Sequence, residues 1–67
     1  MKMGSNSDLT EREKEVLEFI VKGSGDKEIA RNLFISVTTV RTHIDSIFMK
    51  LGVCNRRKLI IKALREK

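Results

Sequence analysis

Apolar residues recur every three or four positions between Ile35 and Gly52, in the segment ISVTTVRTHIDSIFMKLG. This spacing places them on one face of an α-helix. Ser36 suits the N-cap of such a helix, and Gly52 suits the left-handed position just past its end. The pattern therefore predicts a helix over residues 37–51. Its buried stripe is expected to comprise Val40, Ile44, Ile47 and Leu51.

The opposite face of this predicted central helix is mostly polar. It carries Thr38, Arg41, Thr42, Asp45 and Met49. In the major groove of DNA, Arg is the usual partner of guanine, and the methyl group of Thr contacts thymine. The face therefore suits either a DNA reader or a solvated surface, and the helix alone does not favour one over the other.

Two shorter helices are predicted before the central one. The first spans about residues 11–22, where Thr10 and Glu13 form a capping box. The loop Gly23-Ser24-Gly25 separates it from a second helix at about 26–33. Only three residues then lead into the central helix, so the two helices form a helix-turn-helix. An ordinary helical hairpin is the alternative. The expected core residues are Val16, Leu17, Ile20, Ile29, Ala30 and Leu33.

A fourth helix is predicted at about 56–65, with Asn55 as its N-cap. The helix is apolar more than halfway round, and a small domain buries only one face of it. Its buried residues are expected to be Ile60 and Ala63, with Leu59 partly buried. Ile61 and Leu64 then form an exposed stripe, which is typical of a partner surface. Fraying at the end of the chain is the alternative.

The composition agrees with a small all-α domain. The chain has 67 residues, no Pro and few β-branched residues alternating with polar ones. We expect a flexible N-terminal segment at 1–8 and a single four-helix domain at 9–67. No apolar run approaches the ~18 residues that span a membrane, and no secretory segment is recognisable. The sequence thus predicts a cytoplasmic protein with no membrane contact.

Cysteine and histidine usage narrows the chemistry further. Cys54 is the only cysteine, which excludes an intrachain disulfide. His43 and Cys54 cannot supply the four ligands of a structural zinc site, so neither a metal nor a cofactor is expected. Cys54 is interpreted as a small packing residue near a turn. Glu13 and Glu15 point in different directions on a helix and have no nucleophile beside them, so no enzymatic activity is expected.

The positive charge is concentrated in the second half of the chain. Residues 36–67 hold eight basic and two acidic side chains, whereas residues 1–35 hold six basic and seven acidic ones. When basic side chains neutralise the phosphates of a nucleic acid, condensed counterions are released, and this release favours binding. The asymmetry favours a nucleic acid as partner, although a charge of this size also serves solubility.

Most of the chain resembles one family. The matching segments are LTEREKEVLEFIVKG (9–23) and DKEIARNLFISVTTVRTHIDSIFMKLGV (26–53), followed by Arg56. They are similar to the C-terminal helix-turn-helix of LuxR/FixJ-type transcription factors, in order and in spacing. The resemblance implies four helices, of which the third enters the major groove and the fourth forms a two-fold homodimer on double-stranded DNA.

Carried over by position, the resemblance also implies the residues that contact DNA. The base-reading positions correspond to Arg41, Thr42 and Asp45. The phosphate contacts correspond to Lys27, Ser36, Thr38, Thr39, His43, Lys50 and Arg56. The dimer interface is expected at Ile61 and Leu64 of the fourth helix.

Three positions depart from the family pattern. Gly25 replaces the usual Ser or Thr cap of the second helix, so that helix is expected to start at Asp26 with a weaker cap. Leu59 replaces a small residue of the fourth helix. Asp45 stands where many members carry a basic or amide side chain. An acid there accepts a hydrogen bond from cytosine but repels phosphate, which is expected to shift the sequence preference.

These observations predict sequence-specific binding of double-stranded DNA in transcription regulation. The alternative from another class is a helix-turn-helix that docks on a protein such as RNA polymerase. The last domain of sigma factors also resembles this chain and has both functions. The segment KLGV at 50–53, followed by a capped fourth helix, favours the LuxR type.

Overall fold

The computed structural model describes residues 9–65, and the predicted flexible segment 1–8 lies outside them. Four helices follow one another: α1 (Glu11–Val21), α2 (Asp26–Leu33), α3 (Val37–Leu51) and α4 (Arg56–Arg65). No strand occurs in the described range. The predicted all-α, four-helix architecture is confirmed, and α1 differs only in ending one residue earlier, with Lys22 as its C-cap.

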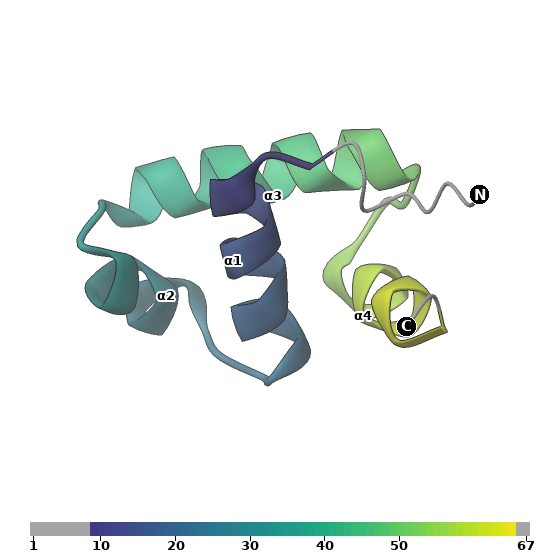
Figure 1. The fold of residues 1–67 in the computed structure, drawn as a ribbon, viewed down its shortest axis with the longest axis horizontal. Coiled ribbons are helices and arrows are strands. Elements are labelled where there is room, and N and C mark those ends of the chain that lie inside the picture. Colours follow the sequence, from purple (N-terminus) through teal and green to yellow (C-terminus); the bar gives the residue numbers. More distant parts are fainter. Residues whose placement is uncertain (1–8, 66–67) are drawn as a thin grey trace.

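The longest helix, α3, organises the other three (Figure 1). Helix α1 crosses it at a steep angle and packs against both α3 and α4. Helix α2 packs against α3 on the other side of α1, and the short turn after α2 leads directly into α3. The two helices of the helix-turn-helix are therefore held at a wide angle, and one long side of α3 stays uncovered.

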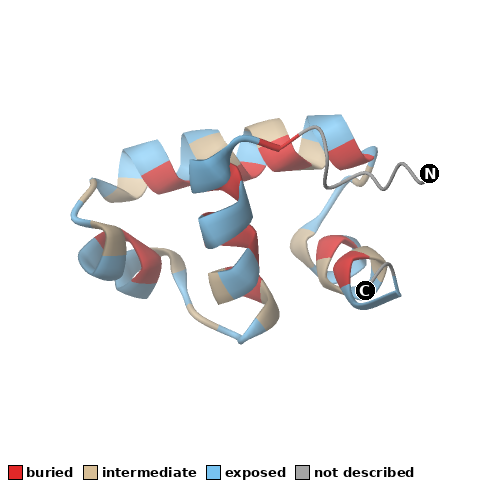
Figure 2. Ribbon diagram, viewed as in Figure 1, coloured by how far each residue is buried: buried red, intermediate tan, exposed pale blue. Residues whose placement is uncertain are grey.

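The core lies where these helices meet. Figure 2 shows the buried positions on the side of α3 that faces α1, with exposed positions along the opposite side. All four residues of the predicted α3 stripe are buried, which confirms the assignment made from helical spacing. Burial of these aliphatic side chains is the main force that fixes α3 in place. The core comprises Leu9, Val16, Leu17, Ile20, Ile29, Ala30, Val40, Ile44, Ile47, Leu51, Leu59 and Ala63.

The predicted packing of α4 is partly wrong. Leu59 is completely buried, whereas Ile60, expected in the core, is only half-buried. Leu59 and Ala63 are four residues apart, so both project from the face of α4 that packs against α1. Ile60 lies about 100° further round the helix. Leu33, also expected in the core, is half-buried because it ends α2 beside the turn.

The helix ends follow the capping signals in the sequence. Thr10 and Glu13 form a complete capping box at α1, and Asn55 Oδ1 accepts a bond of 2.8 Å from the Lys58 backbone at α4. Gly52 ends α3 with φ 69°, a left-handed conformation that costs glycine little. Gly25, by contrast, gives α2 no side-chain cap bond. The weaker cap predicted for α2 is therefore confirmed.

Candidate nucleic-acid interface

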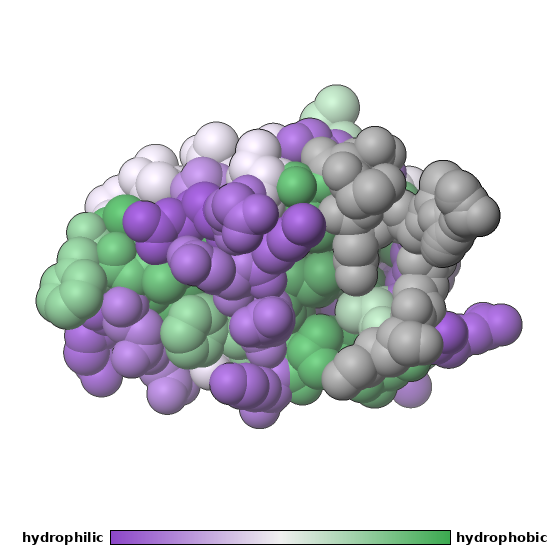
Figure 3. All heavy atoms as spheres, viewed as in Figure 1, coloured by the Kyte–Doolittle hydropathy of each residue, from purple (hydrophilic) through white to green (hydrophobic). Residues whose placement is uncertain are grey.

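The uncovered side of α3 presents the residues predicted to face DNA. Thr38, Arg41, Thr42, Asp45 and Met49 are all exposed. Figure 3 shows pale residues of intermediate hydropathy along the edge of the molecule where Figure 1 places α3. Because the apolar stripe holds the opposite face of the helix in the core, this polar face has a fixed orientation toward solvent.

Hydrogen bonds within α3 order part of this face. Thr42 Oγ1 donates a bond of 3.1 Å to the Thr38 carbonyl, which restricts the rotamer of Thr42. Ser36 Oγ accepts a bond of 3.0 Å from the Thr39 backbone and lies 2.9 Å from Thr39 Oγ1. These two hydroxyl groups flank the N-terminus of α3, where the helix dipole is positive and suits an anion such as phosphate.

A carboxylate from α2 contacts one basic side chain of α3 and one of α4. Asp26 Oδ1 accepts a bond of 2.7 Å from Arg56 Nη1, and Asp26 Oδ2 accepts one of 3.4 Å from Arg41 Nε. Arg56 Nη2 also donates to the Ser24 carbonyl at 3.1 Å. The Arg56 hydrogen bond outweighs the partial burial of Asp26 and, with the two positive charges, lowers the pKa of this carboxyl group.

A second carboxylate holds the C-terminal end of α3. Glu13 is buried and accepts a bond of 2.8 Å from Lys50 Nζ and one of 3.0 Å from the Thr10 backbone. Burial opposes its ionisation. The bonds from Lys50 and Thr10, with the positive charges of Lys50 and His43, prevail and lower the pKa of Glu13. The buried carboxylate is thus paired, as burial of a charge requires.

These pairings divide the residues predicted to contact phosphate into two groups. Lys27, Ser36, Thr38 and Thr39 are exposed around the N-terminal ends of α2 and α3, and His43 is half-buried. Lys50 and Arg56, in contrast, form ion pairs with carboxylates of the domain. Both cations therefore have structural roles that the sequence did not suggest.

No pattern in the sequence indicated that Asp26 and Glu13 pair with these basic residues. The pairs join residues 15, 30 and 37 positions apart, and no local pattern links such positions. Both acids also have a sufficient local explanation in the first turn of a helix, where negative charge is favourable. Only the packing of the helices brings the partners together.

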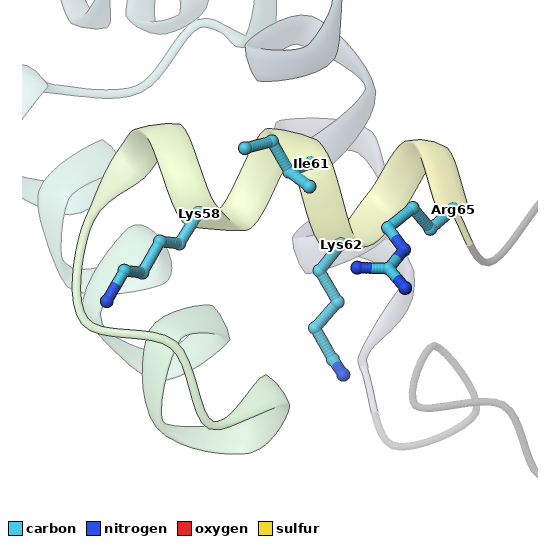
Figure 4. A pocket seen from close by; sticks show the side chains of 4 residues that line it. All are labelled: Lys58, Ile61, Lys62 and Arg65. Atoms are coloured by element: carbon cyan, nitrogen blue, oxygen red, sulfur yellow. The ribbon is translucent and has the colours of Figure 1, made fainter.

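The outer surface of α4 combines apolar and basic side chains. Ile61 and Leu64 are about half exposed, at 47% and 52%. Figure 4 shows Ile61 together with Lys58, Lys62 and Arg65, which line one pocket on this helix. The predicted exposed stripe is present, and its rim is positively charged.

Residues 9–65 also bear on metal binding, on the role of Cys54 and on membrane insertion. No group of three or more His, Cys, Asp or Glu side chains there could hold a metal ion. Cys54 is exposed, so its interpretation as a packing residue is wrong; its sulfur lies 3.6 Å from Lys58 Nζ. No helix in this part of the chain is long and apolar enough to cross a membrane.

The fold and the exposed α3 define a helix-turn-helix domain of the DNA-binding class. Residues 7–63 match the family of bacterial regulatory proteins of the luxR type, and the chain belongs to this family. It is accordingly a DNA-binding domain of transcription regulation, a class that contains regulators and not enzymes.

Two relatives illustrate the match. The spore germination protein GerE of Bacillus subtilis is 49% identical over 57 residues, which cover 85% of this chain and 77% of GerE. The oxygen regulatory protein NreC of Staphylococcus aureus is 48% identical over 59 residues, which cover 88% of this chain and 27% of NreC. The chain thus spans most of one relative and about a quarter of the other.

Proposed function

We propose that the domain binds double-stranded DNA in a sequence-specific manner, with α3 in the major groove. The observation that carries this proposal is the exposed polar side of α3, which the buried stripe on the opposite side holds in a fixed orientation. The major groove is wide enough to admit an α-helix and presents a distinct pattern of donors and acceptors for each base pair. DNA binding of this kind also implies a location in the cytoplasm.

Arg41, Thr42 and Asp45 are the proposed base readers. The side chain of Arg41 is 71% exposed, and a guanidinium group matches the O6 and N7 acceptors of guanine. The Thr42 methyl group suits the thymine methyl group, and the Asp45 carboxylate accepts from the amino group of cytosine. Because one acid lies among these readers, Asp45 is expected to exclude some sequences as well as select others.

Phosphate contacts then fix the orientation of the domain on the duplex. Two groups of residues are proposed for this role. The first surrounds the N-terminal ends of α2 and α3, and the second consists of His43, Lys50 and Arg56 further along the chain. Lys50 and Arg56 keep their carboxylate partners in this proposal, and Arg56 also holds the loop before α2 in place. The proposed phosphate contacts are Lys27, Ser36, Thr38, Thr39, His43, Lys50 and Arg56.

A homodimer through α4 completes the proposal. Ile61 and Leu64 supply a small apolar patch, and a two-fold axis through it would bring the same patches of two copies together. Two copies of α3 would then contact half-sites about one helical turn apart. The basic rim of α4 repels its copy, so the dimer is expected to be weak away from DNA.

Docking on a protein such as RNA polymerase is the second candidate function. It is favoured by Phe34 in the turn between α2 and α3, whose side chain is 93% exposed, and by Met49, which is 83% exposed. Phe and Met are enriched in the interfaces between proteins relative to the rest of the surface.

A salt titration of duplex binding separates the two functions. The affinity for a duplex selected from a random pool is measured by fluorescence anisotropy at rising salt concentration. The DNA-binding proposal predicts a steep linear fall of log K, with a slope of about −0.9 for each phosphate contact. If the pool yields no bound duplex even at low salt, the DNA-binding proposal is contradicted and the protein-docking function is favoured.

A further inference from the structure

Asp26 contacts both Arg41, the proposed base reader on α3, and Arg56 on α4. One carboxylate oxygen pairs with Arg56 of α4 at 2.7 Å, and the other accepts from Arg41 of α3 at 3.4 Å. The Asp26 side chain is 23% exposed, whereas that of Arg41 is 71% exposed. The acid is thus held in place by Arg56, and it reaches outward to Arg41.

Arg41 contacts Asp26 through a nitrogen that leaves its two terminal nitrogens available for a base. The contact is made through Nε, next to the aliphatic part of the side chain. The two terminal nitrogens, Nη1 and Nη2, take no part in it. A guanidinium group carries its donors in a rigid planar fork, so a contact at Nε restricts the directions that the other donors can take.

We infer that Asp26 is a positioning residue for base recognition: it orients the Arg41 guanidinium before DNA arrives and thereby sharpens the preference for guanine at one base pair. This inference rests on the proposed role of Arg41 as a base reader. A free Arg side chain loses much of its rotamer freedom on binding. A carboxylate partner restricts that freedom in advance and favours one geometry of the fork over the others.

The negative charge of Asp26 and its hydrogen bond with Arg56 both support a role in positioning Arg41. The Arg56 bond keeps the Asp26 pKa low, so the group is ionised at neutral pH. Because Arg56 is itself fixed to the Ser24 carbonyl, the carboxylate has a rigid support. A flexible acid on the surface would not restrict Arg41 in the same way.

The test measures base preference at each position of the operator, using the full chain and a pool of duplexes that differ by one base pair. Asp26→Asn keeps the size of the side chain and removes its charge. The preference at the single base pair read by Arg41 is expected to fall roughly threefold, the effect of one exposed charged pair. Preferences at all other base pairs stay unchanged. A purely structural role would instead weaken binding equally at every position.

Two further variants make the result specific. Arg56→Gln removes the anchor of Asp26 and also a proposed phosphate contact, so it is expected to lower the affinity for every duplex and, in addition, to reduce the preference at the base pair read by Arg41. In an Arg41→Ala background, Asp26→Asn is expected to have no further effect on that base pair. An additional loss in this background would overturn the inference.

The remaining outcomes distinguish a failure of this inference from a failure of the proposed base-reading role of Arg41. If Arg41→Ala removes the preference at one base pair but Asp26→Asn leaves it intact, Asp26 does not position Arg41, although Arg41 still reads the base. If Asp26→Asn strengthens binding, the acid withholds Arg41 from DNA, and the inference is wrong. If Arg41→Ala changes no base preference, it is the proposed function of Arg41 that fails.

Discussion

Lys50, near the end of α3, donates a hydrogen bond of 2.8 Å to Glu13 in the first turn of α1, although the two residues are 37 positions apart. The same Glu13 completes the capping box with Thr10. One buried carboxylate therefore both starts α1 and fastens it to α3. Since α3 carries the proposed base readers, this pair contributes to the orientation of the DNA-facing surface.

Replacement of Glu13 is expected to destabilise the domain. Glu13→Gln keeps a hydrogen-bonding side chain but loses the charge that pairs with Lys50, and we expect a loss of about 1–2 kcal/mol in the free energy of unfolding. Urea unfolding followed by circular dichroism measures it. Glu15→Gln is the matched control, because Glu15 forms only an exposed pair with Arg12. Equal effects of the two substitutions would contradict the structural role of Glu13.

The stability of the domain is expected to fall in acid. Folding lowers the pKa of both Glu13 and Asp26, so the ionised carboxylates stabilise the folded state. This contribution is complete above the ordinary carboxylate pKa of about 4 and disappears as the pH falls through the lower values of the folded state. Melting temperatures measured from neutral to strongly acidic pH should therefore decrease only at the acidic end. A double variant, Glu13→Gln with Asp26→Asn, should show a shallower decrease, and an equally steep one would contradict this assignment.

The packing of α4 makes Leu59 more important for stability than Ile60. Leu59 is fully buried, so Leu59→Ala leaves a cavity and is expected to cost about 2–5 kcal/mol. Ile60→Ala removes a side chain that is only half-buried and should cost less than half as much. Thermal unfolding of the two variants in parallel ranks them. A larger loss for Ile60→Ala would mean that α4 is rotated about its axis relative to the arrangement described above.

The outer surface of α4 is testable by its effect on self-association. Leu64→Lys places a further positive charge in the proposed dimer patch, whose rim is already basic, and should reduce both dimerisation and cooperative binding to paired half-sites. Sedimentation with and without operator DNA measures the change. Met49→Lys introduces the same charge at an exposed apolar residue of α3 and should leave self-association without DNA unchanged. Parent-like association of the Leu64 variant would place the dimer contact elsewhere.

Most of the fold followed from local signals in the sequence. The spacing of Val40, Ile44, Ile47 and Leu51 defined the buried face of α3, and Ser36 and Gly52 marked its ends. Such signals are strong because helical periodicity and capping depend on residues close together in the chain. The same holds for the capping box of α1.

What the sequence could not predict depends on how the helices pack. Helix α4 is apolar around more than half of its circumference, so periodicity alone did not distinguish Leu59 from Ile60 as the core residue. The pairing of Asp26 with Arg41 and Arg56 is also invisible locally, because it requires three helices in their final positions. The candidate site was thus predictable as a helix face, but the partners that hold its side chains were not.

The base-reading role of Arg41 is the central claim and is tested most directly by its removal. Affinities of the parent and of Arg41→Ala are measured for the preferred duplex, for single base-pair variants of it and for a scrambled duplex. Lys27→Ala, at a proposed phosphate contact, is the control that should weaken all duplexes equally. For Arg41→Ala we expect a loss of about 1–3 kcal/mol on the preferred duplex and a relaxed preference at one base pair. An equal loss on the preferred and scrambled duplexes would contradict the claim.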